Sequence, residues 1–146
     1  MPAERRPLAG PVVVDASVAV EYLVRLSLTG PAQALFRTLV DGESELWAPD
    51  LVYPESVSAF RRLVRLKAID GESASRAVDD LLRLPLMIAG TRELAGRAWE
   101  LRASLTPYDA CYAVLAELLD APLVTADRKL ARTLSSRGAI FLGDIA

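Results

Sequence analysis

Three consecutive valines at residues 12–14 constrain the fold of this chain more than any other stretch. Valine is stiff at χ1 and packs well on a pleated surface, so the run predicts a short β-strand. The run is apolar without alternation, which is typical of a parallel sheet that helices cover on both faces. It ends at Asp15, and residues 16–26 favour a helix. We therefore expect the Asp15 carboxylate at the carboxyl end of a buried strand, where open α/β sheets bind their ligands.

Strand and helix patterns alternate along the rest of the chain. We expect further strands at residues 45–48, 86–89, 123–125 and 139–142, and helices at residues 31–40, 51–67, 71–84, 91–105, 107–119 and 128–136. This alternation predicts one α/β domain over residues 1–146, with a mainly parallel sheet flanked by helices. Residues 1–10 are expected to form a loose N-terminal leader.

Two of these helices have distinct start signals. Asp50 is the expected N-cap of the helix at 51–67, and Thr106 is the expected N-cap of the helix at 107–119, which has proline in its first position. The apolar stripe of the first of these helices comprises Tyr53, Val57, Phe60 and Val64. Glu55 lies roughly opposite this stripe, so periodicity alone predicts an exposed glutamate.

The chain contains no histidine, and this excludes several kinds of catalytic site. It rules out a Ser-His-Asp or Cys-His apparatus, zinc held by histidine and an imidazole general base. Acid–base or metal chemistry must then come from carboxylates, which favour hard cations such as Mg²⁺ or Mn²⁺. The net charge of −2 is not that of a protein that coats nucleic acid.

Composition indicates a globular protein of the cytoplasm. Hydrophobic residues make up 52% of the chain and charged residues 25%, which favours a folded core over disorder. No apolar run approaches the roughly 18 residues that a membrane helix requires, so we expect no membrane association. The apolar stretch before Asp15 is too short for a secretory signal. Cys111 is the only cysteine, so an intrachain disulfide is excluded.

Three aspartates are expected at one edge of the predicted sheet. Asp15 ends the first strand, Asp127 follows the strand at 123–125, and Asp109 lies in the first turn of the helix that leads into that strand. If the two strands are neighbours, their ends lie about 4.8 Å apart. Carboxylates this close repel one another unless a cation neutralises them. The pattern therefore predicts a divalent-metal site.

Helix capping is the alternative interpretation of the same residues. Asp109 in a first turn and Asp127 before a helix both suit that role. The chain would then be a non-catalytic α/β binding domain. A receiver-type phosphoacceptor fits poorly, because alanine rather than a second acid follows Asp15. A haloacid-dehalogenase-type phosphatase requires Asp-x-Asp, and Ser17 occupies the second place.

Four motifs resemble those of PIN-domain ribonucleases, in particular the VapC toxins of bacterial toxin–antitoxin pairs. They are, in order, Val-Val-Asp15-Ala-Ser17, Val52-Tyr53-Pro54-Glu55, Leu105-Thr106-Pro107-Tyr108-Asp109-Ala110 and Val124-Thr125-Ala126-Asp127. Each motif is weak alone, but four in order over residues 12–142 are fairly specific. The resemblance implies a PIN-like α/β/α sandwich that binds Mg²⁺ or Mn²⁺ and cleaves RNA.

The resemblance also implies roles for individual side chains. On the family's pattern the catalytic acidic residues are Asp15, Glu55, Asp109 and Asp127. The three aspartates would hold the metal, and Glu55 would bind it through water or position the attacking water. Ser17 would orient Asp15, and Thr125 would orient Asp127 in the same way.

The expected partners are RNA, a second copy of the chain and an inhibitor. RNA requires positive charge beside an acidic site, and Arg62 shares the helix face of Glu55 seven residues on. We expect Arg62 to contact substrate phosphate. The resemblance implies a homodimer and a small VapB-like antitoxin whose segment enters the acidic groove. An antitoxin arginine beside the carboxylates would displace or mimic the cation.

Overall fold

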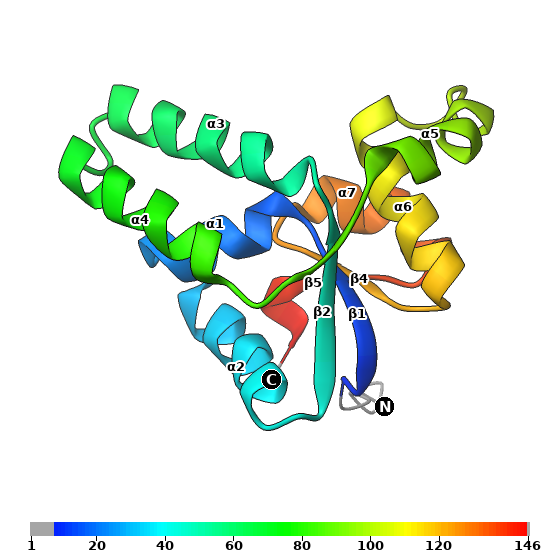
Figure 1. Cartoon of the computed structure of the whole chain (residues 1–146), viewed down its shortest axis with the longest axis horizontal. Coiled ribbons are helices and arrows are strands. Elements are labelled where there is room, and N and C mark those ends of the chain that lie inside the picture. The colour runs from blue at the N-terminus through cyan, green and yellow to red at the C-terminus, as the bar shows by residue number, and fades with distance from the viewer. Residues whose placement is uncertain (1–7, 146) are drawn as a thin grey trace.

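One parallel sheet of five strands forms the centre of the protein in a computed structural model, which describes residues 8–145 (Figure 1). The strand order is β3-β2-β1-β4-β5. The strands are β1 (Gly10–Val14), β2 (Ser44–Pro49), β3 (Met87–Ala89), β4 (Leu123–Thr125) and β5 (Ala139–Phe141). All four strand pairings are parallel. The predicted single α/β domain is therefore confirmed.

Helices cover both faces of the sheet. They are α1 (Ala16–Val24), α2 (Thr29–Val40), α3 (Val52–Arg65), α4 (Gly71–Arg83), α5 (Thr91–Glu100), α6 (Pro107–Leu119) and α7 (Arg128–Thr133). Two short 3-10 turns flank β5. None of the helices within residues 8–145 combines the length and the hydropathy needed to cross a bilayer.

The valine run forms the central strand β1, as predicted, and packs against both layers. Val13 belongs to the apolar cluster that contains most of α6, while Val12 and Val14 belong to the cluster that contains α2. Neighbouring side chains of a strand point to opposite faces, which explains this division. All three valines are fully buried, and each buried side chain of this size contributes roughly 1.5–3 kcal/mol.

The α3–α4 hairpin packs on α1 at one side of the sheet (Figure 1). The fully buried residues of α3 are Val52, Ser56 and Phe60. Val57 of the predicted stripe is instead 44% exposed. Because α3 contacts both α1 and α4, its buried face is turned roughly a quarter turn from the predicted stripe toward Glu55.

Three further predictions about local structure need correction. Asp50 does not cap α3; its carboxylate accepts the backbone N–H of Thr91 at 3.3 Å. The helix predicted at 91–105 ends at Glu100, because the chain turns back toward α6 there. The predicted leader falls mostly outside the described residues, and its last residue, Gly10, belongs to β1, where its N–H donates to the Glu43 carbonyl.

Candidate active site at the carboxyl edge of the sheet

Asp15 is the innermost carboxylate of the acidic edge. It follows β1 directly, and its side chain caps α1 by accepting the Val18 N–H at 3.3 Å. It is only 6% exposed. Burial raises the pKa of Asp15 to about 6, and hydrogen bonds from Ser17, Thr125 and Val18 partly oppose this rise. Asp15 is therefore both a helix cap and a buried acid whose ionised form burial disfavours.

Two hydroxyls hold the Asp15 carboxylate. Ser17 Oγ donates to Oδ1 at 2.5 Å, and Thr125 Oγ1 donates to Oδ2 at 2.6 Å. Both hydroxyl protons are committed to Asp15, so these oxygens accept bonds from the next loop. Ser17 Oγ accepts the Ala126 N–H at 2.9 Å, and Thr125 Oγ1 accepts the Asp127 N–H at 3.0 Å. This network fixes the end of β1 to the end of β4.

Thr125 thus orients a different carboxylate from the one predicted. The sequence pattern assigns it to Asp127, but its hydroxyl donates to Asp15 and binds only the backbone of Asp127. The reason lies in the sheet register. Val14 pairs with Val124, so Thr125 lies directly beside Asp15 across the β1–β4 pair.

Asp109 and Asp127 lie at the same edge but are more exposed. Thr106 caps α6 as predicted, accepting the Asp109 N–H at 3.2 Å. Asp127 caps α7: its Oδ1 accepts the N–H groups of Lys129 at 2.8 Å and Leu130 at 3.1 Å. The capping interpretation therefore holds for Asp15 and Asp127, whereas the cap of α6 is a threonine.

Glu55 is not the solvent-exposed residue that its periodicity predicts. It is half-buried in the first turn of α3, and its Oε1 accepts the hydroxyl proton of Tyr112 at 2.9 Å. Tyr112 comes from α6, 57 residues later in the chain. Because the buried face of α3 is rotated from the predicted stripe toward Glu55, this side chain lies at the edge where Asp15 lies.

The charges of the four carboxylates affect one another. The pKa of Glu55 is raised by burial and then by the charges of Asp15 and Asp109. Burial also raises the pKa of Asp109, and Asp127 adds to this effect. The charge of Asp127 in turn opposes ionisation of Asp15. The pKa values of Asp15, Glu55 and Asp109 are therefore each raised in part by at least one neighbouring carboxylate.

The donor set of this region fits a hard divalent cation. Its ligand atoms are carboxylate and hydroxyl oxygens, the kind that Mg²⁺ and Mn²⁺ prefer. Within residues 8–145, Glu55 Oε2 and Asp127 Oδ2 accept no hydrogen bond. No three acidic side chains of the described chain stand in a closed ligand arrangement. A cation shared by three of them therefore requires these side chains to rearrange, and the exposed Asp127 and half-buried Asp109 have more freedom to rotate than the buried Asp15.

Arg62 is exposed near the far end of α3, and within residues 8–145 its guanidinium makes no hydrogen bond or ion pair with the acidic edge. Seven residues separate it from Glu55, a rise of about 10 Å along the helix. The predicted contact of Arg62 with substrate phosphate therefore stays a prediction.

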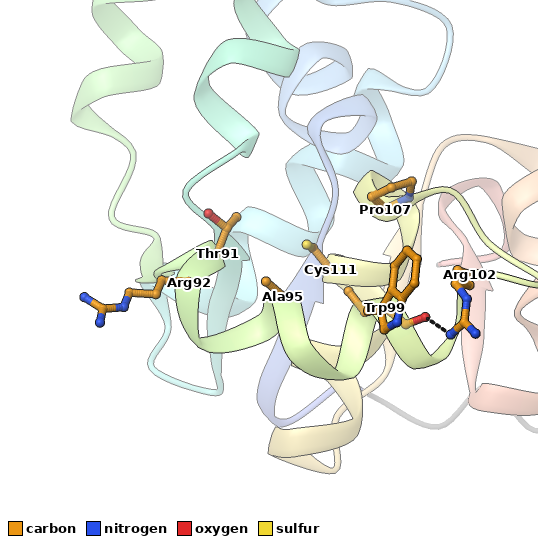
Figure 2. A pocket seen from close by; sticks show the side chains of 8 residues that line it. Thr91, Arg92, Ala95, Trp99, Arg102, Pro107 and Cys111 are labelled. Carbon is orange, nitrogen blue, oxygen red and sulfur yellow. Dashed lines mark hydrogen bonds between the residues drawn. The ribbon is translucent and has the colours of Figure 1, made fainter.

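A second surface feature lies between α5 and α6. This feature is an apolar groove of about 420 Å³. Figure 2 shows its lining residues, Trp99 and Pro107 among them. Trp99 is 66% exposed, and the guanidinium of Arg102 stacks on its ring at 4.3 Å. Cys111 also lines this groove, and none of the four acidic residues does.

The sequence analysis did not single out Tyr112. The signal was present, because Tyr112 follows Asp109 by three residues and so shares its helix face. An aromatic residue on a largely apolar helix is, however, most simply interpreted as core. Only the tertiary structure, which brings Tyr112 of α6 to Glu55 of α3, identifies its hydrogen-bond partner.

Comparisons with known proteins agree on one family. The profile of the PIN domain matches residues 12–134. The VapC ribonuclease Mb0985 of Mycobacterium bovis is 38% identical over 122 residues, covering 84% of this chain and 90% of that protein.

Two solved structures have a similar fold. PAE2754 from Pyrobaculum aerophilum has a TM-score of 0.62 and 26% identity, over 96% of this chain and 89% of that one. The structure of VapBC2 from Rickettsia felis bound to a DNA fragment from their promoter has a TM-score of 0.62 and 16% identity, over 90% of this chain and 96% of that one.

Proposed function

The chain belongs to the PIN-domain family and is of the VapC type, and on this basis we propose that it is a Mg²⁺- or Mn²⁺-dependent endoribonuclease, the toxin of a toxin–antitoxin pair. The observation that carries the proposal is the acidic edge, where a buried Asp15 is held by two hydroxyls and is electrostatically coupled to Asp127 and Glu55, as Glu55 is to Asp109. Repulsion among these charges is relieved by a divalent cation.

The proposed roles follow from where each side chain lies. Asp15, Asp109 and Asp127 hold the metal, and Ser17 and Thr125 keep Asp15 in place. A bound Mg²⁺ or Mn²⁺ supplies a water of lowered pKa and balances charge on the phosphate. Glu55, with one oxygen free of hydrogen bonds from the described residues, binds the metal through water or positions the attacking water.

The proposed substrate is RNA, and Arg62 is the proposed phosphate contact. Proteins that cut RNA at a defined sequence mostly reach bases in unpaired loops, because those bases are not held in a helix. The exposed guanidinium of Arg62 on α3 offers positive charge to offset the acidic edge. We also propose that the protein acts in the cytoplasm, where its substrate is found.

Two protein partners complete the proposal. A VapB-like antitoxin inhibits the site by placing an arginine among the carboxylates, where bidentate charge-assisted bonds replace the cation. A second copy of the chain forms a homodimer, as the resemblance to VapC toxins implies. Light scattering of the purified chain measures its mass in solution, and a monomeric mass would contradict the dimer.

The non-catalytic alternative keeps one observation in its favour, since Asp15 and Asp127 do cap their helices. It does not account for Glu55, which caps nothing, or for the two hydroxyls that hold Asp15. A capping role also leaves Asp127 Oδ2 available. Capping and metal binding are therefore compatible in the same residue.

Calorimetric titration of Mn²⁺ tests the proposal. The wild-type chain should bind saturably, and a variant with Asp15→Asn and Asp109→Asn should not. A control with Asp41→Asn and Asp79→Asn removes the same charge at two exposed positions outside the site and should bind as the wild type does. With Mn²⁺, the wild type and the control should cleave RNA and the Asp15→Asn, Asp109→Asn variant should not. Equal binding in all three proteins would contradict the metal site.

A further inference from the structure

The hydroxyl of Tyr112 reaches the acidic edge from inside the core. Tyr112 is 2% exposed and belongs to the apolar cluster between α6 and the sheet. A buried phenolic hydroxyl requires a hydrogen-bond partner. Its partner here is Glu55 Oε1 at 2.9 Å, on a helix from a different part of the chain. One of the largest buried side chains of the core therefore touches a candidate site residue directly.

The direction of this hydrogen bond is set by the two groups. An ionised carboxylate only accepts, so the Tyr112 hydroxyl must donate. Burial is the main cause that raises the pKa of Tyr112 above its ordinary value, and the charges of Glu55 and Asp15 add to it. The hydroxyl therefore keeps its proton at neutral pH and remains a permanent donor close to both acids.

Glu55 is a residue that needs such a restraint. A glutamate side chain has three rotatable bonds, and one in the first turn of a helix samples several staggered positions unless something holds it. Oε1 is bound to Tyr112, while Oε2 accepts no hydrogen bond from residues 8–145. The contact fixes one oxygen and leaves the other available.

We propose that Tyr112 is a positioning residue that holds the Glu55 carboxylate in the acidic site and so presents its free oxygen to the attacking water. This inference rests on the proposed ribonuclease function. Asp109 lies three residues before Tyr112 on the same face of α6, so one helix places a metal ligand and the restraint on Glu55 together. A catalytic side chain keeps its productive geometry when a well-packed neighbouring residue holds it by a hydrogen bond.

Packing alone does not account for the hydroxyl. A phenylalanine would fill nearly the same volume in the α6 cluster and would bury no polar atom that needs a partner. The tyrosine instead places its polar atom against a carboxylate whose ionisation burial already disfavours. The arrangement serves the position of Glu55 rather than the core.

Kinetics of matched tyrosine variants test the proposal. Tyr112→Phe removes the hydroxyl and keeps the ring, and Tyr108→Phe makes the same change at a tyrosine of α6 that is 64% exposed. With Mn²⁺ and RNA, Tyr112→Phe should lower kcat roughly tenfold with KM changed less than about twofold, and Tyr108→Phe should change neither. An unchanged kcat in Tyr112→Phe would overturn the proposal.

A double-variant cycle shows whether Tyr112 acts through Glu55. In the Glu55→Gln background, Tyr112→Phe should lower kcat no further, because the group it positions is already gone. If the two losses multiply, Tyr112 acts independently and the proposal is wrong.

A structural readout separates this inference from the proposed function. In the metal-free chain, ¹³C relaxation of the Glu55 side chain should show lower order in Tyr112→Phe than in the wild type and Tyr108→Phe, at similar thermal stability. Undiminished order would overturn the restraint. If the wild type cleaves no RNA, the proposed function fails, whereas a loss of Glu55 order would still support the restraint.

Discussion

Asp15 combines a structural and a chemical role in one side chain. It caps α1 through the Val18 N–H, yet burial raises its pKa to about 6 despite three hydrogen-bond donors. A cap alone does not require a buried acid, since exposed Asp70 caps α4 and has a pKa below its ordinary value because of hydrogen bonds to Ser73. The difference between these two aspartates is burial beside other carboxylates.

Arg62 provides a prediction at the scale of one residue. Arg62→Glu should raise the KM for RNA roughly tenfold at low salt and lower the slope of log KM against log salt by about one, because one phosphate contact is lost. Mn²⁺ affinity should not change. Steady-state cleavage and calorimetry measure both quantities.

The control for this prediction is Arg61→Glu, which makes the same charge change about 100° further round α3. It should raise KM much less than Arg62→Glu does. Equal effects of the two substitutions would mean that only net charge matters and that Arg62 has no specific contact.

At the scale of elements, local signals predicted the beginnings of helices better than the faces that they bury. Thr106 caps α6 and Pro107 starts it, as the sequence indicates. Asp50 has the right residue type to cap α3, but it is bound to the Thr91 N–H after β3. Caps depend on three or four neighbouring residues, whereas a buried face depends on every element that packs against the helix.

The two roles of Asp127 can be separated at the start of α7. Asp127→Asn keeps a cap and should leave stability nearly unchanged, while Asp127→Ala should lose about 1 kcal/mol of unfolding free energy. Both should weaken Mn²⁺ binding and RNA cleavage, because both remove the carboxylate. Urea unfolding and calorimetry measure the two effects.

Asp70, the cap of α4, is the matched control. Asp70→Ala should destabilise the protein by a similar amount to Asp127→Ala, and it should not affect Mn²⁺ binding. If Asp127→Asn binds Mn²⁺ and cleaves RNA as the wild type does, Asp127 is a cap and nothing more.

At the scale of the whole molecule, the sheet order brings the chemistry together. The β1–β4 pairing places Asp15 beside Thr125 and brings the start of α7 to the same edge. Helix α3 contributes Glu55 and helix α6 contributes Tyr112, although α4, β3 and α5 lie between these helices in the sequence. The acidic edge is therefore a product of the entire chain and is expected to respond as a unit to pH and cations.

Stability of the metal-free protein should fall as the pH rises from about 4 to 7. The folded pKa of Asp15 is about 6 against 3.8 in the unfolded chain, and Glu55 and Asp109 are shifted in the same direction. The folded state then binds more protons than the unfolded state, so stability present below the unfolded pKa is lost as pH passes through the folded one. For Asp15 the loss is roughly 3 kcal/mol.

Urea unfolding in EDTA between pH 4.5 and 7.5 measures this dependence. Asp15→Asn should flatten it and stabilise the metal-free protein at pH 7. Saturating Mn²⁺ should restore the stability of the wild type. Its unfolding free energy should rise by about 2.7 kcal/mol at a free Mn²⁺ concentration a hundred times the Kd. The exposed acids Asp70 and Glu117 have lowered pKa values and act only at lower pH. A stability that rises from pH 4.5 to 7 would contradict this account.

The sequence by itself determined the elements and the family of this protein. Three buried valines, strand-ending aspartates and the Thr106-Pro107 signal are local patterns, and their order resembles PIN-domain chains closely enough to indicate both fold and acidic residues.

Only the tertiary structure decided which side chains meet. The pairing of β1 with β4 assigns Thr125 to Asp15, and the packing of α3 on α1 and α4 turns Glu55 toward Tyr112. These contacts join residues 57 to 110 positions apart. The periodicity of a sequence depends only on the one or two helical turns around a residue. Contacts between residues so far apart in the chain follow from the order of the strands and from the burial of whole helices.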